Sequence, residues 1–180
     1  MRKFEPLFGF SGIWARELDL KFDDRGHFSE ILRQSDLPDG VPNFVQDSIS
    51  YSKKNTLRGM HLQLNQWQLI TLLDGQIVDV LINLDVDSRN YLKSLSMELS
   101  WNMLNQVLVE PGFAHGFGVI SDVAKIHYKS SVYYGATEQY GVLWNSPEIA
   151  SYWPKHDWII SDRDVEFKTI KDCGSFENNK

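Results

Sequence analysis

The sequence predicts an all-β protein, a sandwich or barrel of antiparallel strands of the jelly-roll or cupin kind. Three observations predict this class. Short strand-like segments follow one another along the chain, with turn signals between them. Clear helical periodicity is scarce. Polar residues fall inside the strands rather than only in the loops, which makes an immunoglobulin-like sandwich the less favoured arrangement.

The first half of the chain supplies five expected strands. Residues 12–22 alternate roughly between apolar and polar, and Asp23-Asp24-Arg25-Gly26 then makes a turn. The apolar residues Phe28 and Ile31 mark the next strand, and a short helix is expected over Arg33–Gly40. Strands at 43–50, 57–63 and 68–73 follow, and the last of them ends at the hairpin signal Asp74-Gly75.

The second half continues the same series. Residues 76–84 read QIVDVLINL, which is rich in β-branched residues and strongly strand-like. Strands at 95–101 and 105–110 lead to the turn Pro111-Gly112, and strands at 117–120 and 124–134 follow it. A second short helix is expected after Ser161.

Composition narrows the class of protein. A chain of 180 residues that is 42% hydrophobic predicts one domain over 1–180, with an N-terminal arm over about 1–22 and a C-terminal tail over about 165–180. A net charge of −6 argues against a nucleic-acid binder.

No apolar run approaches the ~20 residues of a membrane span, and the start lacks the apolar core of a secretory signal. The single cysteine, Cys173, excludes an internal disulfide, so we expect a cytoplasmic protein.

Polar side chains recur where the buried face of a sheet should be apolar. Alternate residues of a strand in a closed barrel point inward, and several buried polar groups without partners would cost several kcal/mol. A polar-lined cavity that holds a ligand explains the set better than edge strands that face solvent. Its members are Gln46, Arg58, His61, Gln63, Asp79, His115 and Tyr128.

A metal site is not favoured. Metal-binding cupins use a His-x-His pair, a nearby glutamate and a later histidine. Here His61 is followed two positions on by Gln63, and His115 is the later histidine, without a carboxylate at the expected place. A transition metal usually needs three or four such ligands. His27, His127 and His156 lie where surface histidines are ordinary.

His61 is instead a candidate base, because a neutral imidazole accepts a proton near neutral pH. Its tautomer would be fixed by a carboxylate, for which the sequence offers Asp47, Asp79 and Asp164. Cys173 lies in a polar tail and is a poor nucleophile, and the chain has neither a nucleophile elbow nor a glycine-rich phosphate loop. The residues therefore indicate proton transfer rather than covalent catalysis or nucleotide hydrolysis.

Several longer motifs resemble the dTDP-4-dehydrorhamnose 3,5-epimerase family, cupins that epimerise nucleotide-linked 4-keto sugars. They occur in the family's order across about residues 10–165. The matching stretches are DDRGHFSE (23–30), FVQDSISYSKKNTLRGMHLQ (44–63), DGQIVDV (74–80), VEPGFAHGFGV (109–119), HYKSSVYYGATEQYGVLWNSPEI (127–149), WP (153–154) and ISDRD (160–164).

The resemblance implies a division of roles. His61 matches the family's catalytic base, Asp164 its aspartate partner, and Tyr128 the general acid on the opposite face of the sugar. It also implies a nucleotide-sugar substrate, no cofactor and no metal, and a homodimer that shares N-terminal strands, here Phe8–Leu20. Matching substrate-binding positions are Arg25, Glu30, Gln46, Arg58, His115, Tyr134 and Glu138.

Departures from the family leave alternatives open. Gln68 replaces a lysine near the reacting sugar, and Thr71 replaces an arginine. A neutral amide should stabilise an enolate less well than an ammonium group. The chain could therefore be a double epimerase, an epimerase that acts at C3 or C5 alone, or a non-catalytic sugar-nucleotide-binding cupin. The sequence does not choose the nucleotide, with thymidine as the family default and a purine as the alternative.

Overall fold

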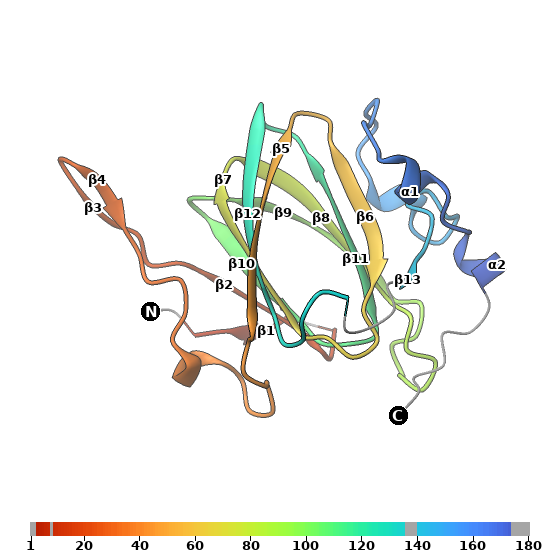
Figure 1. Ribbon diagram of the computed structural model, residues 1–180, viewed down its shortest axis with the longest axis horizontal. Coiled ribbons are helices and arrows are strands. Elements are labelled where there is room, and N and C mark those ends of the chain that lie inside the picture. Colours follow the sequence, from red (N-terminus) through yellow and green to blue (C-terminus); the bar gives the residue numbers. More distant parts are fainter. Residues whose placement is uncertain (1–2, 8, 136–139, 174–180) are drawn as a thin grey trace.

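Two antiparallel sheets face each other in the computed structural model, which describes residues 3–7, 9–135 and 140–173 (Figure 1). The first sheet runs in the order β1 (Glu5–Pro6), β2 (Ile13–Glu17), β10 (Leu104–Val109), β7 (Gln68–Asp74), β12 (Val123–Ser130) and β5 (Gln46–Lys53). The second runs β13 (Tyr140–Gly141), β6 (Leu57–Leu62), β11 (Phe113–Val119), β8 (Gln76–Asn83) and β9 (Ser94–Ser100). The all-β prediction is confirmed.

In the part of the chain that the structure describes, helical structure is limited to short pieces. The expected helix over Arg33–Gly40 is only the 3₁₀ turn η1 (Gln34–Asp36), because Pro38 and Gly40 do not continue it. The helix expected after Ser161 is α1 (Asp162–Val165). The other pieces are η2 (Ala150–Tyr152) and α2 (Ile170–Cys173). Among the described residues, no helix has the length and apolar character to span a membrane.

Three apolar clusters hold the layers together. The first lies between the two sheets and includes Ile70 and Phe117. The second lies on the outer face of the five-stranded sheet, where the C-terminal segment covers it with residues such as Trp153 and Ile170. The third lies on the outer face of the six-stranded sheet under residues 32–44. The sandwich is therefore covered on both sides by segments that contain almost no regular structure.

The N-terminal segment contributes to the six-stranded sheet of its own chain. Within Phe8–Leu20, strand β2 pairs with β10 on one side and with β1 on the other. Ile13 of this strand is fully buried in the apolar cluster between the two sheets. The part that projects from the body is the hairpin of β3 (Lys21–Asp23) and β4 (Gly26–Phe28) (Figure 1).

A β-bulge in β6 sets the direction of two side chains. Against β11, His115 faces His61, but Phe117 faces Arg58, so β6 contains one extra residue at this point. Gly59 has φ +125°, and a Cβ atom there would lie 2.6 Å from the Cα of Gly116. Residues three positions apart on a regular strand point to opposite faces. The bulge turns both Arg58 and His61 to the same face.

Candidate active site

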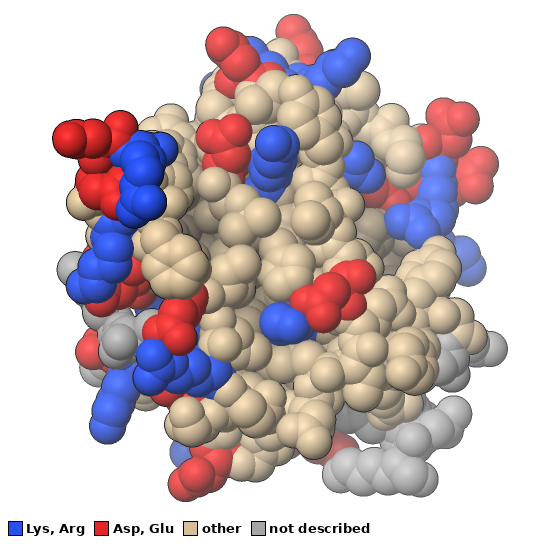
Figure 2. Space-filling model, turned by 60° about the vertical axis from the view of Figure 1, so that its left-hand side comes forward, with Lys and Arg blue, Asp and Glu red and all other residues tan. Residues whose placement is uncertain are grey.

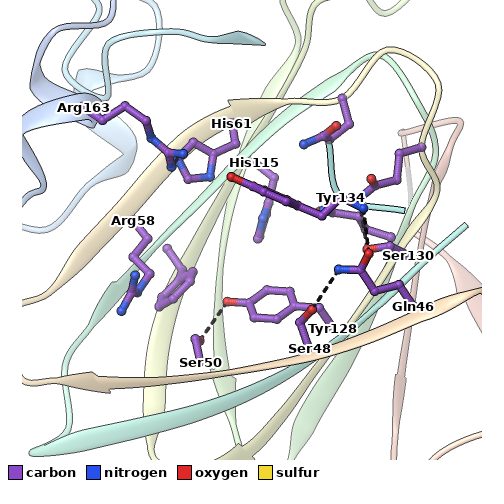
Figure 3. Close-up of a pocket in the computed structure, with 14 residues that line it drawn as sticks. Gln46, Ser48, Ser50, Arg58, His61, His115, Tyr128, Ser130, Tyr134 and Arg163 are labelled. Atoms are coloured by element: carbon purple, nitrogen blue, oxygen red, sulfur yellow. Dashed lines mark hydrogen bonds between the residues drawn. The ribbon is translucent and has the colours of Figure 1, made fainter. Parts of the chain in front are cut away.

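A pocket of about 270 Å³ lies between the two sheets, walled mainly by inward-facing strand residues (Figure 3). The expected site residues that line it are Gln46, Arg58, His61, Gln68, His115, Tyr128 and Tyr134. They come from five strands and from the loop after β12. The structure therefore brings most of the predicted site together around one cavity.

His61 is held by Asp164, the last residue of the ISDRD motif. Nε2 of His61 lies 2.9 Å from Oδ1 of Asp164, and the backbone N–H of Gly59 donates to Oδ2 at 3.1 Å. Arg163 lies at the same place, with its Nε 3.2 Å from Oδ1 of Asp164 and its Nη2 2.9 Å from Nε2 of His61. A carboxylate and a guanidinium thus both contact the edge of one imidazole.

The C-terminal segment delivers Asp164 through backbone contacts along β6. Ile159 accepts a hydrogen bond from the backbone of Leu57 at 2.9 Å and donates one to Asn55 at 2.7 Å. Ser161 then caps α1, because its hydroxyl accepts from the backbone N–H of Asp164 at 3.2 Å. These contacts place the first turn of α1 beside the bulge at Gly59.

Asp164 is 2% exposed and stays ionised. Burial opposes its ionisation, but hydrogen bonds from His61 and from the backbone of Gly59, with the positive charges nearby, outweigh that effect. The pKa of Asp164 is lowered to about 2. The dyad therefore contains a carboxylate at every pH at which the protein would work.

Tyr128 lies across the pocket from His61, and its hydroxyl is 3.1 Å from Oγ of Ser50 (Figure 3). Burial raises the pKa of Tyr128 to about 12, while the hydrogen bond with Ser50 and the charge of Arg58 partly offset the rise. Arg58 itself donates from Nε to Oγ of Ser52 at 2.9 Å. Tyr128 is therefore a neutral proton donor beside a guanidinium.

The three candidate partners for His61 each pair with a different histidine. Asp164 contacts His61, Asp79 makes a short contact with Nε2 of His115, and Asp47 lies 2.7 Å from Nε2 of His127. Asp79 is fully buried inside the sandwich, and Asp47 lies on an exposed surface. Sequence alone does not separate these aspartates, because the paired residues are 103, 36 and 80 positions apart and leave no local pattern.

Three other positions named from the sequence are described by the structure and lie outside the pocket. Arg25 is exposed at the turn of the β3–β4 hairpin, with Nη2 2.6 Å from Oδ2 of Asp23. Glu30 pairs with Arg33 on the surface. Thr71 is buried on the outer face of its sheet, where its hydroxyl accepts from Gln106 at 2.8 Å, so its difference from the family does not alter the pocket. Glu138 lies outside the described residues.

Gln63, expected in the polar-lined cavity, also lines the pocket, whereas six other described lining residues were absent from the prediction. Three are serines or glutamines that continue the inward face of β5 and β12, a signal present in the alternation of Gln46, Ser48 and Ser50. Arg163 had no such signal, because its position depends on the whole C-terminal segment. The full set is Ser48, Ser50, Gln66, Phe117, Ser130 and Arg163. Among the described residues, no group of three His, Cys, Asp or Glu side chains could hold a metal ion.

Comparison with known proteins gives a consistent family match. The family model described as dTDP-4-dehydrorhamnose 3,5-epimerase matches residues 8–172. The chain is 37% identical over 155 residues to the dTDP-4-dehydrorhamnose 3,5-epimerase of Escherichia coli K12, which covers 82% of this chain and 84% of that protein.

Two solved structures extend the match to the fold. The dTDP-4-dehydrorhamnose 3,5-epimerase of Bacillus anthracis, solved with TDP and PPi bound, is 38% identical with a TM-score of 0.81, covering 88% of this chain and 94% of that one. NovW, a 4-keto-6-deoxy sugar epimerase from the novobiocin gene cluster of Streptomyces spheroides, is 27% identical with a TM-score of 0.87, covering 95% and 88%. The predicted cupin-type architecture is confirmed.

Proposed function

Because the chain belongs to the dTDP-4-dehydrorhamnose 3,5-epimerase family, we propose that it inverts C3, C5 or both in a dTDP-linked 4-keto-6-deoxy sugar. The chain is accordingly an isomerase of the carbohydrate epimerase class. The observation that carries the proposal is the pair of proton-transfer groups on opposite sides of one pocket, His61 with its carboxylate and the protonated Tyr128.

The chemistry follows from the acidity of carbons next to a ketone. His61 removes the proton from C3 or C5, and the electron pair moves onto the C4 oxygen to form an enolate. Tyr128 donates its proton to the same carbon from the other face, the ketone reforms, and the configuration is inverted. The imidazolium then loses its proton to solvent and the tyrosinate regains one, which restores both groups. No electrons enter or leave the substrate in these steps. Asp164 stabilises the imidazolium that forms in the first step.

The developing enolate needs a hydrogen-bond donor or a positive charge near the C4 oxygen. Gln68 lines the pocket with a neutral amide, while Arg58 and His115 also line it. Two guanidinium groups, Arg58 and Arg163, stand close to His61 and suit the diphosphate of the substrate. Tyr134 is 71% exposed at the pocket and offers a ring for the base to stack on.

A homodimer would explain the two expected residues that lie away from their own pocket. Arg25 and Glu30 lie in and just after the projecting hairpin, which also exposes Phe22 and Phe28 to 64% and 70%. Ile49 on β5 is 68% exposed. Figure 2 shows this side of the molecule, where the charges stand in separate groups with wide uncharged surface between them. We infer that two copies pair through this side and that the hairpin carries Arg25 to the partner's pocket.

The test of the function is proton NMR of dTDP-4-keto-6-deoxyglucose in deuterated buffer with the purified protein. Deuterium should enter at C3, C5 or both, and His61→Ala should lower the exchange rate by about two to four decades. A rate no higher than that without enzyme would reject the substrate or the assignment of His61. Unchanged ligand affinity in His61→Ala without any exchange in the wild type would instead favour a non-catalytic binding protein.

A second candidate function is epimerisation at one carbon only. It is favoured by Gln68, which gives this part of the pocket no charge of its own. The same experiment separates the two functions, because each acidic carbon exchanges independently. Deuterium at both carbons identifies a double epimerase, and deuterium at one carbon identifies a monofunctional enzyme.

A further inference from the structure

We propose that the hydrogen bond from Arg163 to His61, called the latch below, keeps the catalytic base inactive. The latch is released when an anionic group such as the substrate's diphosphate draws the guanidinium away from His61. The inference rests on the proposed function for the role of His61 as a base. The exchange of hydrogen-bond partners at His61, however, is measurable without turnover.

Two neighbours compete for one atom of His61. Nη2 of Arg163 and Oδ1 of Asp164 each lie 2.9 Å from Nε2. A ring nitrogen carries either one proton or one lone pair, whereas a guanidinium only donates and a carboxylate only accepts. Arg163 can therefore bind Nε2 only when that atom is bare, and Asp164 only when it is protonated. The two hydrogen bonds exclude each other.

Whether Nε2 binds Arg163 or Asp164 decides whether His61 can act as a base. With Arg163 on Nε2, the proton of the neutral imidazole sits on Nδ1, and neither nitrogen has a lone pair available for a substrate proton. With Arg163 gone, the Nε2 proton is donated to Asp164 and Nδ1 is bare. Only the second arrangement provides both a free basic atom and a carboxylate that stabilises the imidazolium.

Arg163 is the partner that is able to move. Its side chain is 55% exposed, whereas that of Asp164 is 3% exposed and is held by the backbone N–H of Gly59. Arg163 also stands between the pocket and a second cavity of about 450 Å³ on the other side of His61, and Arg58 lines both cavities. The charged groups here are Arg58, Arg163 and Asp164, so an arriving anion meets two guanidinium groups and one buried carboxylate.

A diphosphate competes well for such a guanidinium, because charge-assisted hydrogen bonds to phosphate oxygens are stronger than one to a neutral imidazole. Binding of the anionic half of the substrate would thus activate the base that acts on the sugar half. The free enzyme would hold His61 unable to take a proton.

The test is ¹⁵N NMR of histidine-labelled protein at about pH 8, where an ordinary imidazole is neutral. His61 is assigned by comparison with His61→Asn. Without ligand, we expect a bare Nε2 and a protonated Nδ1, and saturating inorganic pyrophosphate should reverse the pattern. Arg163→Met should show the reversed pattern without ligand, and Arg163→Lys should restore the pattern of the free wild type. Arg89→Met, a charge-matched change on an exposed loop, should behave as the wild type.

A protonated Nε2 in the free wild type, or no response to pyrophosphate, would overturn the latch. If Arg163→Met does not fold, the pyrophosphate titration of the wild type still decides. Deuterium exchange on the keto sugar keeps the two proposals apart. A reversal of the ring pattern without exchange would keep the latch and reject the substrate. Exchange with an unchanging ring pattern would keep the epimerase and reject the latch.

Discussion

The hydroxyl of Tyr128 lies 3.1 Å from Oγ of Ser50, on the wall of the pocket across from His61 (Figure 3). This contact fixes the direction of the phenol in a setting that keeps it protonated, since burial raises its pKa to about 12. Tyr128 therefore offers a proton to the pocket from the wall opposite the candidate base His61.

Replacing Tyr128 by Phe should separate the two half-reactions. His61 should still exchange the carbon proton with deuterated solvent, whereas inverted product should fall by about two to four decades because its proton donor is gone. NMR follows both quantities in one sample. Equal losses of exchange and inversion would show that Tyr128 acts in the first step as well, and Ser50→Ala tests whether the phenol must be held in place.

Asp164→Asn should change how stability depends on pH. The folded pKa of about 2 lies below the unfolded value of about 3.9, so the ionised group contributes stability above about pH 4 that is lost as pH falls toward 2. The contribution is on the order of 2 kcal/mol. The difference in unfolding free energy between wild type and variant, measured by urea denaturation, should therefore shrink from about pH 6 to about pH 3. A constant difference would mean that the carboxylate charge contributes nothing.

Gly59→Ala should damage both stability and the site. A Cβ at Gly59 would lie 2.6 Å from the Cα of Gly116 and 2.8 Å from the carbonyl of His115, and its φ is +125°. We expect a loss of about 2–4 kcal/mol in unfolding free energy, together with lost activity as the bulge shifts. Gly40→Ala is the matched control, because its φ is also positive but nothing lies within 4 Å of the added atom.

The control should lose only about 1 kcal/mol, the backbone strain alone, and should keep full activity. Thermal unfolding and the exchange assay, run on both variants, give the comparison. Similar losses in the two variants would show that close packing against β11 does not matter at Gly59.

Gln68→Lys should raise the rate of enolate formation. An ammonium group stabilises a developing oxyanion better than a neutral amide, and we expect about a tenfold gain in deuterium exchange at the carbon nearer to residue 68. Gln68→Met, which removes the donor at similar volume, should lower the same rate. If lysine and methionine have the same effect, the side chain at 68 does not face the enolate oxygen.

The sequence was sufficient for the buried central strands of the two sheets. Continuous apolar runs bounded by turn residues predict β7 and β8 nearly to their ends, because both faces of these strands lie against apolar clusters. The two-residue strands β1 and β13 were missed, since they contain too few residues to show alternation and exist only through their partners β2 and β6.

The site residues also divide into those that the sequence predicted and those that only the fold brings together. His61 and Tyr128 were identified from the motifs that carry the resemblance. That Arg58 and His61 share a face does not follow from their spacing, because a regular strand would separate them. Their common direction depends on the bulge at Gly59. The bulge fits against β11 because neither Gly59 nor Gly116 has a Cβ atom. Arg163 was missed because a contact across about 100 residues leaves no local pattern.

His61 and Asp164 lie far apart in the sequence, and this separation determines when the site can form during biosynthesis. A nascent chain that has emerged as far as Ser130 contains every strand of the inner core, so the sandwich is able to begin folding on the ribosome. His61 meets its carboxylate only after the segment from Ile159 to Asp164 has been translated and has paired beside β6. Premature termination or a proteolytic cut before this segment would leave His61 without Asp164, so the catalytic pair is completed last.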